Sequence, residues 1–315
     1  MNPEGKIYQF IFNHIAQIKW QWRVLLYFVL STVLAGLISA LYGVFLQPVS
    51  PDPFVHDLIT LVHFTGSLAG VWILTWTLLR LIDKRPWRSI GLSFHPEWTR
   101  EFLFGLLLGA LTPLVLFVLL LPWGFVSLSV QSVEVMTFII SLVLNVLIWI
   151  TAAIWLELVL RGYFLQTMAE GMGKIVATIF VSLMYALIRI QFHTDQLIPA
   201  LNIAALGFVL SICYFRTRAL WTGIGIQFSM NFIQNFLFGT PVQGVRPSYS
   251  LFKTEVLSRN IAVGDYFSME QGLIAFLILV SCIYYLFQSK QLVISETVRK
   301  IKFDALSKPF FVVKK

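Results

Sequence analysis

The sequence is poor in charge and nearly free of cysteine. Charged side chains make up 12% of the 315 residues, about half of the roughly 25% that soluble domains carry. This scarcity excludes an ordinary soluble domain, whose surface needs more charge. Cys213 and Cys282 are the two cysteines, and both lie inside apolar segments, where a cysteine acts as a small hydrophobic side chain. A disulfide framework and a thiolate metal site are therefore excluded.

Long apolar runs make up most of the sequence. Hydrophobic residues make up 58% of the chain, the mean hydropathy is +0.81, and eight runs approach the roughly 20 residues that cross a bilayer. The first run is too long for a signal peptide and lacks a small-residue cleavage site, so we expect it to remain in the mature protein. The sequence predicts an all-α, polytopic membrane protein with eight transmembrane helices. The predicted spans are residues 24–46, 58–82, 101–122, 135–160, 174–190, 197–215, 219–238 and 270–288.

Two short appendages flank the predicted membrane domain of residues 24–288. Residues 1–23 place apolar side chains at helical spacing beside polar ones, which favours an amphipathic helix on the membrane surface. Residues 289–315 form a basic, cytosolic tail. The apolar positions of the first segment are Ile7, Phe10, Ile11, Ile15, Ile18 and Trp22.

The distribution of Lys and Arg predicts the orientation. With the N-terminus in the cytosol, eighteen of the 23 Lys and Arg residues fall on inner segments and three on outer ones, as the positive-inside rule requires. A basic inner surface facing anionic lipid accounts for the net charge of +8. We therefore expect an integral protein of a bacterial plasma membrane, with both termini cytosolic and no nucleic-acid partner.

Polar residues inside three of the predicted spans mark a candidate site. Glu157 and Arg161 share one span, Arg189 follows in the next, and Gln227 and Asn231 lie one turn apart in a later one. Charges at that depth are costly, so each is a functional-site hypothesis. The helix-breaking segment 171–173 lies about 21 Å from Glu157 along one helix and about 24 Å from Arg189 along the next. Similar depths predict a polar cavity enclosed by three helices.

The order of these residues resembles the CPBP family of intramembrane proteases, which includes CAAX prenyl endopeptidases and bacteriocin-immunity homologues. The likeness covers roughly residues 80–290. The family's motifs are Glu-Glu-x-x-x-Arg, Phe-x-x-x-His and His-x-x-x-Asn. Here they read Leu156-Glu157-Leu158-Val159-Leu160-Arg161, Tyr185-Ala186-Leu187-Ile188-Arg189 and Gln227-Phe228-Ser229-Met230-Asn231.

The resemblance implies a role for each motif position. The family's first glutamate and second-motif histidine activate water, and here Leu156 and Arg189 replace them. Its third-motif histidine and asparagine hold the oxyanion, and here they are Gln227 and Asn231. Its second glutamate and arginine are structural, and they are retained as Glu157 and Arg161.

These substitutions remove the expected chemistry. A general base must accept a proton near the working pH and contributes about 10²- to 10⁴-fold to the rate. Leu156 accepts none, and Arg189 is always charged. The sequence therefore predicts no proteolysis by the family mechanism, whereas Gln227 with Asn231 still offers hydrogen-bond donors.

Several interpretations of single residues stay open. Glu157 and Arg161 have the i, i+4 spacing of an intrahelical ion pair. Arg189 either pairs with Glu157 or presents a fork of donors to a carboxylate or lipid phosphate. His193, one turn after Arg189, is a candidate replacement for the missing histidine.

The function that the sequence favours is an inactive protease relative, a pseudoenzyme, which binds a membrane lipid, a peptide or a membrane-protein partner through the polar cavity. One alternative is an active endopeptidase with a rearranged site that uses Glu157 and His193. The other is a transporter or a structural subunit of a membrane complex. No cofactor or metal is expected, because a metal site needs several ligands together and Glu157 with one distant histidine does not supply them.

Overall fold

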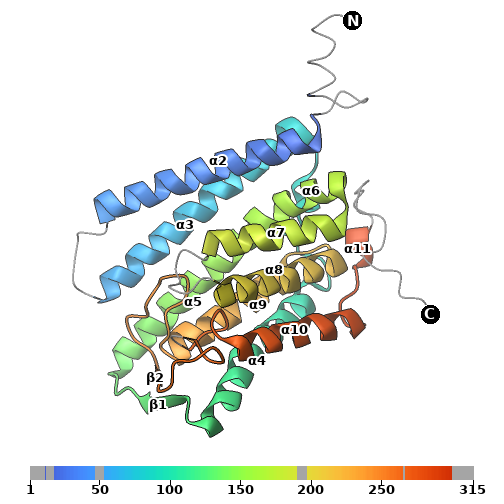
Figure 1. Cartoon of the computed structure of the whole chain (residues 1–315). Coiled ribbons are helices and arrows are strands. Elements are labelled where there is room, and N and C mark those ends of the chain that lie inside the picture. The colour runs from blue at the N-terminus through green and yellow to red at the C-terminus, as the bar shows by residue number, and fades with distance from the viewer. Residues whose placement is uncertain (1–10, 12–17, 47–52, 190–196, 265–266, 300–315) are drawn as a thin grey trace, which may run out of the picture.

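The chain forms a bundle of helices (Figure 1). The computed structural model describes residues 11, 18–46, 53–189, 197–264 and 267–299. Apolar runs become helices in a membrane because helices satisfy every backbone donor and acceptor internally. The helices are α2 (Trp20–Leu41), α3 (Pro53–Leu78), α4 (Trp98–Leu120), α5 (Val135–Glu157), α6 (Leu165–Met172), α7 (Lys174–Arg189), α8 (Leu197–Thr217), α9 (Trp221–Phe232), α10 (Leu273–Gln288) and α11 (Glu296–Arg299).

Five helical stretches are long and apolar enough to cross a membrane, so the chain is a polytopic, mostly helical membrane protein. Each of the eight predicted spans overlaps a helix, but α7 and α10 have 16 residues each and α9 has 12. The predicted count of eight spanning helices is therefore not confirmed. The five stretches are Trp20–Val44, Phe54–Asp83, Trp98–Trp123, Val135–Met172 and Leu197–Thr217.

A small sheet departs from the predicted all-α fold. Strand β1 (Val126–Val130) pairs antiparallel with β2 (Phe252–Val256), with Val126 opposite Val256. The sheet joins the connection between α4 and α5 to the long loop that precedes α10 (Figure 1). The alternation Val-Ser-Leu-Ser-Val is typical of a strand, but its five residues are too short to stand out beside the apolar helices.

The predicted turn at 171–173 is confirmed. It lies at the end of a long helical stretch that begins with α5. Helix α5 continues through a π-helical segment, Leu158–Phe164, into α6, so the helical stretch has 38 residues. That stretch is about 57 Å long, against about 30 Å for the hydrocarbon core. Gly173 ends it with φ of 80°, a conformation open to glycine at no steric cost, and α7 begins at Lys174.

An ion network fastens α2 to the rest of the bundle at this same end. Arg23 of α2 is nine-tenths buried and pairs with Asp83 and, at 2.5 Å, with Glu170 of α6. Arg85 pairs with Glu170 as well. The start of α2, the turn between α6 and α7, the end of α10 and α11 lie together at one end of the bundle (Figure 1).

The two predicted appendages are only partly described. The range 1–23 lies largely outside the described residues, and α2 already begins at Trp20. Residues 300–315 of the predicted tail also lie outside them. The preceding segment packs against α8, because the guanidinium of Arg216 donates to the backbone carbonyls of Leu286, Ser289 and Leu292.

Glycines bring α4 and α9 into close contact. A Cβ atom at Gly105 would lie 2.3 Å from the carbonyl oxygen of Thr222, and one at Gly109 would lie 2.3 Å from that of Ile226. Small residues one turn apart let two helix backbones approach in a membrane. Because α9 carries Gln227 and Asn231, this contact fixes the position of both side chains.

Gly109→Ala is expected to lower the thermal stability of the purified protein, because its methyl group would meet backbone that cannot rotate away. Overpacking of this kind costs about 1–3 kcal/mol. The matched control is Gly36→Ala on α2, where an added Cβ meets nothing within 4 Å and alanine favours the helix by about 1 kcal/mol. Melting in detergent checks both, and equal melting temperatures for the two variants would contradict the close-contact interpretation.

Candidate functional site

The polar side chains predicted from the sequence do come together, inside the protein rather than at its surface. Glu157, Arg161, Gln227 and Asn231 are each 0% exposed, and Arg189 is 1% exposed. They come from α5 with its π-helical continuation, from α7 and from α9. Buried charges must be paired and hydrogen-bonded to be tolerated, so the partners of each side chain define the site.

Glu157 is held by two donors. Its Oε1 accepts a hydrogen bond of 2.6 Å from Nε2 of Gln227 and one of 3.3 Å from Nη1 of Arg161. The predicted i, i+4 ion pair is therefore confirmed. Arg161 also donates to the carbonyl oxygen of Gly207 on α8 at 3.2 Å. These contacts join three helices through one carboxylate, which agrees with a structural role for the retained Glu157 and Arg161.

Arg189 has a partner that neither interpretation of the sequence named. It forms an ion pair with Glu270 and donates a hydrogen bond to the hydroxyl of Tyr185, so the interpretation that paired it with Glu157 is wrong. The physical reason is position: Glu270 lies just before α10 and reaches Arg189 from the neighbouring segment, while Arg161 and Gln227 already occupy Glu157. The sequence contained one signal for Glu270, an acidic residue at the edge of an apolar run.

Tyr185 connects the two halves of the network. Its hydroxyl donates to Oε1 of Gln227 at 3.2 Å. The guanidinium carbons of Arg161 and Arg189 lie 4.9 and 5.3 Å from the centre of its ring, within the range of cation–π attraction. A continuous path of contacts therefore runs from Glu270 through Arg189, Tyr185 and Gln227 to Glu157.

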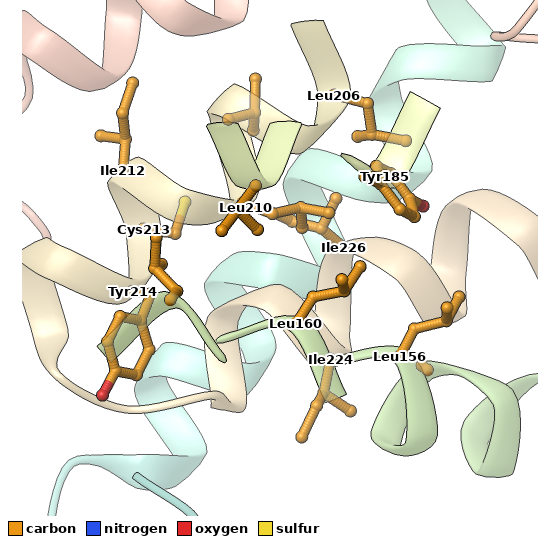
Figure 2. Close-up of a cluster of buried hydrophobic side chains, with 14 of the residues drawn as sticks. Leu156, Leu160, Tyr185, Leu206, Leu210, Ile212, Cys213, Tyr214, Ile224 and Ile226 are labelled. Atoms are coloured by element: carbon orange, nitrogen blue, oxygen red, sulfur yellow. The ribbon is translucent and has the colours of Figure 1, made fainter. Parts of the chain in front are cut away.

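Leu156 lies in an apolar environment beside this path. It is 3% exposed and belongs to the main hydrophobic core. Figure 2 shows Leu156 and Leu160 projecting from one helix in the same cluster as Tyr185 and Leu206. The resemblance implies a water-activating carboxylate at this position. The leucine packs against apolar side chains there instead.

A cavity of about 480 Å³ adjoins Leu156. Its walls come from α2, α3, α5 with the π-helical segment, and α7, and they are mainly hydrocarbon. The polar side chains on its wall include hydroxyls, and that of Tyr27 lies 3.2 Å from the hydroxyl of Thr75. The lining includes Tyr27, Leu34, Ala35, Ser67, Trp155, Leu156, Leu160 and Met184.

Asn231 differs from the other site residues. Neither atom of its side-chain amide has a hydrogen-bond partner within the described part of the chain. A fully buried amide without a partner is costly, so this group is available to a ligand or to water. The π-helical segments Leu158–Phe164 and Ile233–Leu237 begin directly after Glu157 and two residues after Asn231, and such segments are frequent at functional sites.

His193 lies outside the described residues. His63 of α3 lies 3.4 Å from the hydroxyl of Ser39 on α2. Over the described ranges, no group of three or more His, Cys, Asp or Glu side chains is placed to hold a metal ion.

In a comparison with known proteins, one family model matches the segment that contains the three motifs. Residues 138–233 match the family model described as type II CAAX prenyl endopeptidase Rce1-like. This range runs from α5 to the end of α9 and contains all three motifs. Neither the curated proteins nor the solved structures give a match.

Arg161→Ala is expected to destabilise the protein strongly, because it leaves the buried carboxylate of Glu157 without its cation. Removing one partner of a buried ion pair costs about 3–5 kcal/mol. Thermal unfolding in detergent measures the loss. The double variant Glu157→Gln/Arg161→Ala should be less destabilised than Arg161→Ala alone, since the charge is then gone.

Lys253→Ala is the matched control for this prediction. Lys253 pairs with Glu255 at 2.8 Å, but both side chains are more than half exposed, and such pairs contribute little. We expect no measurable change in its melting temperature. If Arg161→Ala melted like Lys253→Ala, the structural role of the Glu157–Arg161 pair would be refuted.

Proposed function

We propose that this chain, a membrane protein whose residues 138–233 form an Rce1-like domain of the CPBP type, has lost proteolysis and binds the hydrocarbon chain of a membrane lipid or a lipidated peptide. The observation that carries the proposal is the environment of Leu156. The position that resembles the first catalytic glutamate is occupied by an apolar side chain on the wall of an apolar cavity.

The contacts of the remaining site residues support the loss of water activation. The guanidinium of Arg189 pairs with Glu270 and cannot accept a proton. The Oε1 atom of Glu157 already accepts two hydrogen bonds. Its Oε2 faces Gly223, where even a Cβ would lie only 2.3 Å away, so little room is left beside it for a water and a peptide carbonyl.

The cavity suits a hydrocarbon chain. Its volume of about 480 Å³ falls within the roughly 300–1,000 Å³ of small-molecule sites. Its lining helices α2, α3 and α5 belong to stretches that are long and apolar enough to span the membrane, so a lipid chain could enter without crossing water. The description of the matching family names a prenyl endopeptidase, and a prenyl group is a hydrocarbon chain of this kind.

We also propose a more detailed membrane topology for the chain. In addition to the five long stretches, helices α7, α9 and α10 also cross a bacterial plasma membrane, which gives eight spans. The end of the bundle with the start of α2 and α11 faces the cytosol. The excess of Lys and Arg on the segments at that end supports this orientation.

The purified full-length protein in lipid bilayers is expected to release no product from a farnesylated CAAX-type peptide or from its unprenylated counterpart. Both side chains that would activate water are replaced. The loss of a general base by itself lowers the reaction rate by about 10²- to 10⁴-fold. Mass spectrometry of the peptides measures cleavage, with an active CAAX-type endopeptidase run in parallel. Cleavage that disappears in Glu157→Gln would overturn the proposal in favour of a rearranged active site.

Ala35→Phe is expected to weaken binding of a farnesyl chain about tenfold, because the phenyl ring fills part of the cavity. Loss of contact with two buried CH₂ groups, at about 0.8 kcal/mol each, accounts for this factor. Photo-crosslinking with a diazirine-labelled farnesylated peptide measures binding, and labelling near Leu156 or Met184 identifies the site.

The matched control is Ala40→Phe. Ala40 lies on the same helix, is exposed and does not line the cavity. Its variant should be labelled like the unchanged protein. Equal labelling of Ala35→Phe and Ala40→Phe would place the chain elsewhere and contradict this part of the proposal.

A further inference from the structure

A second cavity lies at the start of α4, apart from the site described above. It has a volume of about 630 Å³ and lies between the first turns of α4 and the segment of residues 291–296. It shares no lining residue with the cavity beside Leu156. Its polar wall includes Glu97, Arg100 and Glu101, and its apolar wall includes Leu103, Phe104 and Leu107.

Glu101 is a buried carboxylate with unused hydrogen-bonding capacity. The residue is 5% exposed, and neither carboxylate oxygen has a hydrogen-bond partner among the residues the structure describes. Its Oε2 lies 3.3 Å from Nε2 of His95, whose Nδ1 lies 3.3 Å from Glu97. A buried carboxyl group whose oxygens make no hydrogen bond is costly, so this cavity wall favours a ligand that brings N–H groups.

The second acidic group of the wall is fixed in place. The hydroxyl of Ser295 donates a hydrogen bond to Oε2 of Glu97. This bond lowers the pKa of the Glu97 carboxyl below its ordinary value, so the group is ionised at neutral pH. Arg100 lies on the same wall and is exposed. The Glu97 carboxylate and the Arg100 guanidinium thus offer complementary charges to a zwitterion, and the Glu101 carboxyl adds further hydrogen-bond acceptors.

Aromatic side chains near the start of α4 support a position for this cavity at the level of lipid headgroups. The rings of Phe94, Trp98 and Trp221 lie within 5.0–5.1 Å of one another, and Phe94 is 75% exposed. Exposed aromatic residues at the end of a spanning helix mark the membrane–water boundary. Further along α4, Leu103 and Leu107 are about 60% exposed, one turn apart, and present an apolar path toward the hydrocarbon.

We propose that this cavity binds a phospholipid whose headgroup carries a primary ammonium group. Glu101 and Glu97 accept hydrogen bonds from the ammonium, Arg100 donates to the phosphate as a planar fork, and the acyl chains lie along Leu103 and Leu107. Phosphatidylethanolamine has this chemistry. Phosphatidylcholine has the same charges without N–H donors, and phosphatidylglycerol has no ammonium group.

The test uses the full-length protein in detergent, exposed to equal amounts of phosphatidylethanolamine, phosphatidylcholine and phosphatidylglycerol, with bound lipid measured by native mass spectrometry. The ethanolamine lipid should be retained preferentially. Glu101→Gln should reduce its retention about tenfold, since a hydrogen bond to a charged group contributes about 1.5–3 kcal/mol. Glu255→Gln, an exposed carboxylate on β2, is the matched control and should bind like the unchanged protein.

Arg100→Gln keeps the test decisive if Glu101→Gln does not fold. It alters an exposed side chain and should weaken retention of both phosphatidylethanolamine and phosphatidylglycerol, which share the phosphate. Equal retention of the three lipids by the unchanged protein would overturn the proposal. Displacement of the lipid by soluble glycerophosphoethanolamine at similar concentration would also overturn it, because the cavity would then take a free zwitterion rather than a lipid.

Discussion

The carboxylate of Glu157 is the constraint on which the interior of this protein depends. It is fully buried, and its Oε1 joins α9 through Gln227 and the π-helical segment through Arg161, which in turn reaches α8 through the carbonyl of Gly207. A buried charge that lost these donors would be far costlier than an apolar side chain. The three helices are therefore required to keep their register, and the rest of the core packs around that register.

Each position that differs from the motifs that the chain resembles has surroundings suited to its own residue. Arg189 has Glu270, Gln227 lies between Tyr185 and Glu157, and Leu156 packs in apolar surroundings. A histidine at position 189 would remove the arginine that pairs with Glu270, which is 4% exposed. Arg189, Tyr185, Gln227 and Glu157 thus form one connected arrangement, which a single substitution within it would disrupt.

The sequence predicted correctly those features that depend on residue spacing along one helix. The Glu157–Arg161 pair follows from i, i+4 geometry, and the turn before α7 follows from Gly171 and Gly173. The partner of Arg189 did not follow, because Glu270 is 81 residues away and only tertiary packing brings them together. The strands β1 and β2 failed to stand out for a related reason: each has five residues, and their pairing depends on a long-range register. Both cavities likewise depend on tertiary packing, one between helices and the other between α4 and the segment of residues 291–296.

Gly223 shows how such packing restricts the order of evolutionary change. A methyl group there would collide with Oε2 of Glu157, whose carboxylate is held in place by the two donors to its other oxygen, Oε1. A larger residue at position 223 is compatible with the fold only after position 157 has lost its carboxylate, and the reverse path is closed in the same way. The two positions are therefore expected to vary together in descendants of this chain, with the glycine preserved for as long as the acid remains.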